Sequence, residues 1–246
     1  MRKSKKADEF HRPVVWVVGA SRGIGREIAK QFALIGSEVC LSSRSAHALR
    51  SAVKEITDLG GRAYSFPCNV SSYKEIFSIS KKIQKKFDNV DVLINAAGIT
   101  VFKSFLTTTL TEFDAIINTN LRGPIFCIKS VLPNMVERKS GWIINVVSNA
   151  AIKTFEGSAA YTATKAGLLG LSKVVREEMR HHNIKVVSVI PGATKTEMWS
   201  RGMQRKYGHR MMSSKSVAEA VLSAYQMPND VVVDEIVVRP MMGDVE

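Results

Sequence analysis

The sequence predicts an α/β domain built on a doubly wound parallel sheet with helices on both faces. The chain has 246 residues, a length that suits one large domain with a full hydrophobic core. Short apolar runs rich in β-formers alternate with longer segments of helical period, and repeated β-α-β units of this kind form parallel sheets. No Gly/Ser linker or repeat of fixed period divides the sequence, so we expect a single domain.

The first two elements show how the assignments are made. Val14–Val18 is a continuous apolar run, which is typical of a strand buried on both faces. In the next segment Ile24, Ile28 and Phe32 recur at helical spacing, and Gly36 follows as the residue that ends the helix. The same criteria predict strands at 14–18, 38–41, 62–67, 90–94, 142–147, 184–190 and 235–238, and helices at 23–35, 45–59, 72–87, 123–138, 158–181 and 214–227.

Local signals mark several of the later boundaries. Gly60-Gly61 closes the second helix, and Ser72 with Glu75 three residues later resembles a capping box at the start of the third. Pro124 is tolerated in the first turn of the helix at 123–138, and Pro191-Gly192 stops the strand at 184–190.

Composition excludes several classes of protein. A hydrophobic fraction of 45% with 23% charged residues is ordinary for a globular chain and excludes wholesale disorder. The three cysteines are widely spaced and form no C-x-x-C motif, so we expect no disulfide scaffold, no metal site and a reducing compartment. No apolar run approaches the roughly 18–20 residues of a membrane span. We therefore expect a soluble, cytoplasmic protein.

Positive charge is in excess. The chain has 35 Lys and Arg against 22 Asp and Glu, a formal net charge of +13, which raises nucleic acid, an anionic membrane or an acidic ligand as partners. Residues 1–12 form a basic N-terminal extension that we expect to be flexible, and the apolar run behind it is too short for a secretory signal. No motif for RNA or DNA accompanies the extension, so we expect neither nucleic acid nor membrane as a partner.

A glycine-rich turn joins the first strand to the first helix and reads Gly19-Ala20-Ser21-Arg22-Gly23-Ile24-Gly25. Glycines let the backbone approach a ligand closely, and the N–H groups at a helix N-terminus bind phosphate. The strand before the turn and the helix after it favour a dinucleotide site over a turn that merely needs glycine. The segment also fits G-x-S-x-G, the nucleophile elbow of serine hydrolases, but no earlier strand supplies the oxyanion loop of such enzymes.

A second motif lies on the predicted helix at 158–181. Tyr161 and Lys165 are four residues apart and therefore share one helix face. A tyrosine pKa of about 10 is too high for acid/base catalysis near neutrality, and a cation held beside the phenol lowers it. Alone, such a pair is common on solvated helix faces. Ser148 changes the interpretation, because it closes the preceding strand and can donate a hydrogen bond to a substrate oxygen.

Together the motifs resemble the classical short-chain dehydrogenase/reductase family from about residue 13 onward, and the chain is similar to its 3-oxoacyl-[acyl-carrier-protein] reductases. The matching residues are Gly19-x-x-x-Gly23-x-Gly25, Asn95-Ala96-Ala97-Gly98, Asn120, Ser148, Tyr161-x-x-x-Lys165 and Pro191-Gly192-x-x-x-Thr196. The resemblance implies a Rossmann-type sheet of about seven strands in a dinucleotide-binding and catalytic domain at 13–246. It also implies hydride transfer between a nicotinamide and a carbonyl/alcohol pair.

The resemblance assigns roles to single residues. Tyr161 is implied to be the acid/base, and Ser148 to orient the carbonyl. Lys165 is implied to lower the pKa of Tyr161 and to bind the nicotinamide ribose, and Asn120 to hold a water that links Lys165 to solvent. The implied cofactor-binding residues are Gly19, Ser21, Arg22, Gly23, Ile24, Gly25, Arg44, Asn69, Val70, Asn95, Ala96, Ala97, Gly98, Tyr161, Lys165, Pro191, Gly192, Thr194 and Thr196.

Three residues depart from the family pattern. Val18 stands where Thr is frequent and Ala96 where a second Asn is usual. Both positions mainly tie the central strands together, so these changes bear on stability more than on chemistry. Asn69 replaces the Asp that usually contacts the adenine amino group, and its carbonyl can still accept that hydrogen bond.

The end of the second strand indicates which nicotinamide is used. An NAD enzyme places a carboxylate there for the ribose 2′-hydroxyl, whereas an NADP enzyme supplies cations for the 2′-phosphate. Here the strand ends in Ser42-Ser43-Arg44 without an acid, and Arg22 in the glycine turn can approach the same phosphate. We therefore expect NADP(H).

Residues 198–218, which the resemblance places in a substrate lid, combine methionines and Trp199 with five cations and no acid. The cations are Arg201, Arg205, Lys206, Arg210 and Lys215. We expect a small-molecule or acyl-thioester carbonyl substrate, with a 3-oxoacyl group on an anionic carrier as one case. The alternative is a solvated basic loop unrelated to the substrate, and residues 234–240 lack the Gly-Gly ending common in 3-oxoacyl reductases.

Two classes of function fit these observations. The first is NADP(H)-dependent reduction of a ketone to a secondary alcohol. The second is a catalytically idle NADP(H)-binding sensor or scaffold on the same fold, which need not keep Asn120, Ser148, Tyr161 and Lys165. By analogy with the family we expect a homo-oligomer, a tetramer or a dimer, that pairs the helices at 123–138 and 158–181.

Overall fold

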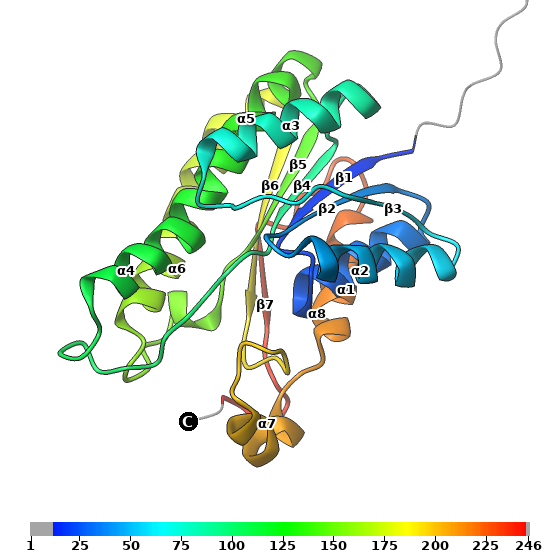
Figure 1. Ribbon diagram of the computed structural model, residues 1–246. Helices are drawn as coiled ribbons and strands as arrows, with labels where there is room; N and C mark the ends of the chain where they lie inside the picture. The colour runs from blue at the N-terminus through cyan, green and yellow to red at the C-terminus, as the bar shows by residue number, and fades with distance from the viewer. Residues whose placement is uncertain (1–11, 245–246) are drawn as a thin grey trace, which may run out of the picture.

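A sheet of seven parallel strands forms the centre of the protein, in the order β3-β2-β1-β4-β5-β6-β7 (Figure 1). The structure is a computed structural model and describes residues 12–244. The strands are β1 Val14–Val18, β2 Glu38–Ser42, β3 Arg62–Ser65, β4 Val92–Asn95, β5 Gly141–Val146, β6 Ile184–Pro191 and β7 Glu235–Val238. The order reverses between β1 and β4, and sheets of this type bind ligands at the carboxyl ends of such a pair.

Helices cover both faces of the sheet (Figure 1). They are α1 Gly23–Leu34, α2 Ala46–Asp58, α3 Tyr73–Phe87, α4 Leu110–Ile117, α5 Gly123–Arg138, α6 Ala159–Met179, α7 Arg201–Tyr207 and α8 Ser214–Tyr225. Helices α1, α2 and α8 pack on one face, where Phe32 and Leu49 are fully buried. Helices α3, α5 and α6 pack on the other, with Ile76 and Trp16 fully buried. The doubly wound fold expected from the sequence is confirmed.

The predicted elements agree with the structure to within two residues at each end. Two helices were not predicted, α4 and α7. The sequence around α4 is rich in threonine, and the helix has 8 residues and buries only Ile116. α7 has 7 residues, none of them buried, and lies in the segment expected to be a lid. Both helices are shorter than the periodic segments by which the others were recognised.

The capping box expected at the start of α3 is only half present. Ser72 Oγ accepts a hydrogen bond from Glu75 N at 3.3 Å. The Glu75 carboxylate does not return to Ser72, because it accepts from Asn69 N at 2.8 Å. A complete capping box instead starts α4, formed by Thr109 and Glu112.

The expected basic extension at residues 1–12 lies outside the described residues except for Arg12. Within residues 12–244 no helix is long and apolar enough to cross a membrane.

Candidate active site

The glycine turn after β1 packs backbone against backbone. Gly19 has a φ of +95°, and a Cβ there would lie 2.4 Å from Ala97 N. A Cβ at Gly25 would lie 2.4 Å from Gly19 O. Only glycine fits either position. Arg22, at the N-cap of α1, is extended and makes no capping bond through its side chain, so the first N–H groups of the helix stay available to a phosphate.

Four predicted catalytic side chains meet at the carboxyl ends of β4 and β5. Tyr161 and Lys165 come from α6 and are 9% and 3% exposed, and Asn120 is fully buried. The hydroxyl of Ser148, two residues after β5, is hydrogen-bonded to the phenol of Tyr161. A methyl group at Gly98 would lie 3.8 Å from Lys165 Nζ and 3.7 Å from Asn120 Oδ1. The structure thus gathers these groups around one point.

Asn120 lies on a π-helical turn, Asn118–Arg122, between α4 and α5. Its side chain donates to Ile99 O at 2.8 Å and accepts from Ile99 N at 2.9 Å. It also donates to Thr164 Oγ1 of α6 at 3.3 Å. Asn120 therefore fixes the loop after β4 against α6. Turns of this kind are frequent at functional sites, and no residue spacing indicated one here.

Burial sets the protonation of the central pair. It raises the pKa of Tyr161 above the ordinary 10.0, partly offset by the hydrogen bond with Ser148. It lowers the pKa of Lys165 from 10.5 to about 8. The expected lowering of the Tyr161 pKa by Lys165 is not seen, because desolvation dominates and Lys165 Nζ donates to Val146 O at 2.8 Å. The phenol is consequently protonated at neutral pH.

The end of β2 carries the groups expected to select the cofactor. Arg22 and Arg44 are exposed, and neither guanidinium has a hydrogen-bond partner within residues 12–244. The hydroxyl of Ser43 is buried and also lacks a partner among these residues. Sequence reasoning missed Ser43, whose only signal was its place at the strand end. Asn69 Oδ1 accepts from Ser71 N at 3.1 Å and keeps a second lone pair.

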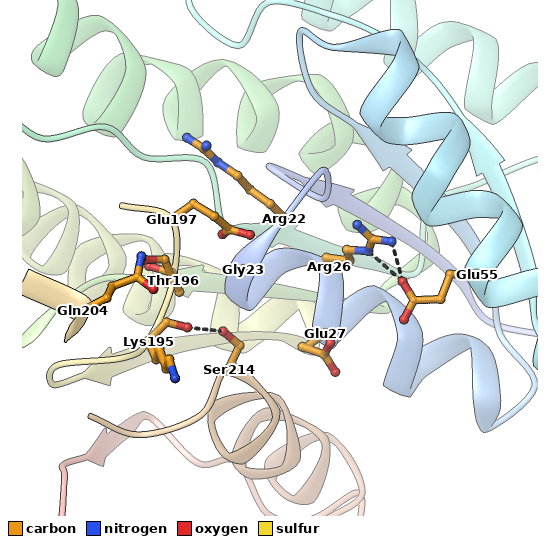
Figure 2. A pocket seen from close by; sticks show the side chains of 10 residues that line it. All are labelled: Arg22, Gly23, Arg26, Glu27, Glu55, Lys195, Thr196, Glu197, Gln204 and Ser214. Carbon is orange, nitrogen blue, oxygen red and sulfur yellow. Dashed lines mark hydrogen bonds and ion pairs between the residues drawn. The ribbon is translucent and has the colours of Figure 1, made fainter. Parts of the chain in front are cut away.

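Figure 2 shows a pocket of about 440 Å³ on the outer side of the glycine turn. Arg26 is paired with Glu55 across it, whereas the Arg22 side chain points away from this pair. The pocket is lined by Arg22, Gly23, Arg26, Glu27, Glu55, Lys195, Thr196, Glu197, Gln204 and Ser214. A Cβ at Gly23 would lie 3.2 Å from Thr196 Cγ2 and 3.8 Å from Glu197 Oε2. The segment after β6 thus closes on the N-terminus of α1, and the Glu197 carboxylate there was not foreseen.

The same segment also reaches the catalytic groups. Met198 Cε lies 3.9 Å from the position of a methyl group at Gly98. The ring of Trp199 stacks on Phe102, with centroids 5.8 Å apart and an angle of 18° between the planes. Phe102 belongs to the loop after β4, and no motif singled it out. Apolar side chains from two distant loops therefore form the mouth of the site.

Thr194 and Val70, which were also predicted to bind the cofactor, mainly make contacts within the protein. Thr194 donates to Gly192 O at 3.0 Å and is 5% exposed. Val70 packs on α5, where a Cβ at Gly123 would lie 2.6 Å from Val70 Cγ2.

The central strands are tied together by a chain of buried amides. Asn95 donates to Asn145 Oδ1 at 2.8 Å, and Asn145 donates to Ser172 Oγ at 2.9 Å. This chain joins β4, β5 and α6.

Comparison with known proteins identifies the family to which this fold belongs. The family model described as short chain dehydrogenase matches residues 13–206. The chain belongs to this family. It is 31% identical over 240 residues to a sepiapterin reductase of Chlorobaculum tepidum, covering 95% of this chain and 98% of that protein. It is 38% identical over 186 residues to a 3-oxoacyl-[acyl-carrier-protein] reductase of Synechocystis sp., covering 75% of each.

Among solved structures, a metagenomic short-chain oxidoreductase in complex with NADP is similar in fold. Its TM-score is 0.83 at 33% identity, over 93% of this chain and 97% of the other. Membership of the short-chain dehydrogenase family confirms the resemblance drawn from the motifs. The bound NADP of that neighbour agrees with the cofactor expected from the end of β2.

Proposed function

We propose that this short-chain dehydrogenase reduces a ketone to a secondary alcohol with NADPH. The observation that carries the proposal is the meeting of a buried phenol, a buried ammonium and a serine hydroxyl at the carboxyl ends of β4 and β5. Burial of Tyr161 and Lys165 costs free energy, and no structural role of these side chains offsets that cost. Such costs are typical of groups kept for chemistry.

Each side chain has a task in the reduction. Ser148 donates a hydrogen bond to the carbonyl oxygen and orients it. Tyr161, held protonated by burial, donates its proton to that oxygen as the alcohol forms. Bound NADPH supplies the hydride that the carbonyl carbon receives. Lys165 returns a proton to the phenolate, and Asn120 holds the water that reprotonates Lys165 from solvent.

The residues present fit NADP(H). The turn at Gly19 and Gly25 is packed so closely that only glycine fits, and the N-terminus of α1 that follows it offers N–H groups to a diphosphate. Arg22, Arg44 and the unpaired hydroxyl of Ser43 supply donors for a 2′-phosphate. The NADP complex of the metagenomic relative supports the same choice.

We propose an acyl substrate, with a 3-oxoacyl thioester as the first candidate. The mouth of the site is apolar, and Phe105 and Leu106 on the loop before α4 are 74% and 93% exposed. The exposed Arg201, Arg205 and Lys206 of α7 give the lid a positive surface that suits an anionic carrier. Similarity to the Synechocystis reductase supports this class.

We also propose a cytoplasmic homo-oligomer, a dimer or a tetramer, in which α5 and α6 pair with those of a second copy. Val174 on α6 is 57% exposed, and the space around Gly170 on the same helix is open, so this face can accept a partner helix.

Loss of NADPH absorbance tests the activity with ketones, diketones, quinones, sepiapterin and 3-oxoacyl thioesters. Tyr161→Phe is the matched control, because it removes one oxygen and leaves the ring. We expect it to lower kcat about 10²- to 10⁴-fold while NADPH binding stays unchanged. Tight NADPH binding without turnover on any substrate would support the idle sensor instead. Equal kcat/KM for carrier-linked and small ketones, unaffected by salt, would exclude the carrier.

A further inference from the structure

A carboxylate to which the proposed chemistry gives no task lies beside the catalytic serine. Asp244, six residues after β7, has a side chain only 6% exposed. Its Oδ1 accepts a hydrogen bond from Asn149 Nδ2 at 3.0 Å. Asn149 directly follows Ser148, is itself 3% exposed, and begins the 3₁₀ turn Asn149–Ala151. The carboxylate therefore contacts the residue next to Ser148, whose hydroxyl is proposed to orient the substrate.

Two cations complete the surroundings of this carboxylate. Lys153 Nζ donates to Asp244 Oδ2 at 3.1 Å from the loop between β5 and α6. The Arg239 guanidinium also donates to Oδ2, from the end of β7. Gly243, with a φ of +80°, makes the turn that brings Asp244 back toward these partners, and Gly243 N donates to Pro240 O at 2.9 Å. The carboxylate thus accepts one neutral and two charge-assisted hydrogen bonds.

The same segment also holds the far end of the lid. Arg210 follows α7 and donates to the backbone oxygens of Met242 at 3.3 Å and of Asp244 at 3.1 Å. Two residues later, Met212 N donates to Ala193 O at 3.0 Å, beside the loop after β6. Figure 1 shows this end of the chain lying next to α7. Residues 239–244 thus form a strap that joins the loop after Ser148 to the base of the lid.

We propose that Asp244 is a positioning residue that holds the turn after Ser148 so that its hydroxyl meets the substrate carbonyl. The inference rests on the proposed function. Ser148 Oγ accepts from Ala150 N at 3.2 Å, so the serine rotamer depends on the turn that Asn149 begins. If the Asp244–Asn149 bond is lost, the turn shifts and the serine with it. Misplacement of a catalytic group by about 1 Å can cost about 100-fold in rate.

Asp244→Ala removes both carboxylate oxygens, and with them the bond from Asn149. We expect kcat to fall about 10- to 100-fold with KM and the Kd for NADPH within about two-fold, since the carbonyl contact strengthens in the transition state. Asp58→Ala is the matched control, because Asp58 is an exposed carboxylate paired with Lys54 on α2, far from the site. It should leave kcat unchanged.

A merely structural role for Asp244 predicts a different result. It would lower the Tm and leave kcat per folded molecule unchanged, and that outcome overturns the proposal. Asn149→Ala keeps both ion pairs of Asp244 and removes only the link to the turn. It should lower kcat as much as Asp244→Ala, and the double variant should add little. If Asp244→Ala fails to fold, an unaffected kcat in Asn149→Ala overturns the proposal by itself.

Turnover by the wild type in the same assay distinguishes failure of the positioning role from failure of the proposed function. An active wild type with an unaffected Asp244→Ala refutes the positioning role and leaves the reductase function standing. A wild type that binds NADPH and reduces no carbonyl refutes both.

Discussion

Lys165→Met should make the protein more stable while it abolishes turnover. The ammonium of Lys165 is 3% exposed, and burial lowers its pKa from 10.5 to about 8. The folded protein therefore carries a charge in a place that disfavours it. Methionine fills a similar volume without that charge. Activity is lost because the proposed proton return to Tyr161 needs the amine.

The size of the effect follows from the two pKa values. A factor of ten in protonation is worth about 1.4 kcal/mol, so at pH 7 the interval from 10.5 to about 8 costs the folded state about 3 kcal/mol. The variant also loses the bond from Lys165 to Val146 O, which contributes about 1 kcal/mol. The net gain at pH 7 is about 2 kcal/mol.

The sign of the pH dependence gives a second check. Between pH 8 and 10.5 the unfolded chain binds more protons at Lys165 than the folded chain does, so the free energy of unfolding rises with pH in this window. The cost of burial is present in full below pH 8 and is relieved above it. From pH 7 to pH 9 the wild type should gain about 1 kcal/mol from this residue, and Lys165→Met should lack that gain.

Urea denaturation of the cofactor-free protein at both pH values measures these effects. Lys81→Met, on the exposed side of α3, controls for the loss of one positive charge and should change stability little. The reasoning is refuted if Lys165→Met is less stable than the wild type at pH 7, or if it keeps the wild-type rise toward pH 9.

Three further predictions concern the proposed cofactor site and the core. Arg22→Ala and Arg44→Ala should each weaken NADPH binding about 10- to 100-fold and leave NADH binding unchanged, since only the 2′-phosphate needs a cation. Equal losses of affinity for NADPH and NADH in fluorescence titrations would contradict this. Gly19→Ala should abolish cofactor binding, because its methyl would lie 2.4 Å from a backbone nitrogen. Gly36→Ala meets open space and should cost only about 1–2 kcal/mol of strain. Equal falls in Tm for the two variants would show that the backbone clash at Gly19 has no effect of its own. Asn145→Ala breaks two buried hydrogen bonds and should lower the free energy of unfolding by about 1–3 kcal/mol per unpaired group in urea titrations. An unchanged urea midpoint would show that these bonds do not stabilise the fold.

The sequence predicted the fold well where apolar periodicity decides structure. The stripe of Ile24, Ile28 and Phe32 forms α1, and every predicted strand pairs in the sheet. The π-helical turn at Asn118–Arg122 could not be predicted, because it depends on one side chain bonding to both backbone groups of Ile99. Such a turn leaves no trace in residue spacing.

The site was predicted to the extent that its residues belong to contiguous motifs. The glycine turn and the pair Tyr161 and Lys165 carry their spacing in the sequence. Phe102 and Asp244 do not, since each reaches the site through the path of a loop. The protonation of the pair was also misjudged: adjacency alone suggested a lowered tyrosine pKa, whereas the depth of burial, which sequence does not report, raises it.

The carboxyl edge of the sheet holds several polar groups whose burial costs stability. Lys165 is charged and buried there, and Ser43, Asn95 and Thr100 each hold a buried oxygen without a partner in residues 12–244. An unpaired buried polar group costs about 1–3 kcal/mol. A sheet selected only for stability would fill these positions with apolar side chains, as it does at Val15, Trp16 and Val17 within β1. The polar groups lie where β2 and β4 end and where the proposed cofactor and carbonyl would supply the missing partners. Because a ligand that pairs these groups binds the folded state, saturation with NADPH should raise the Tm by more than it does in variants that lack them.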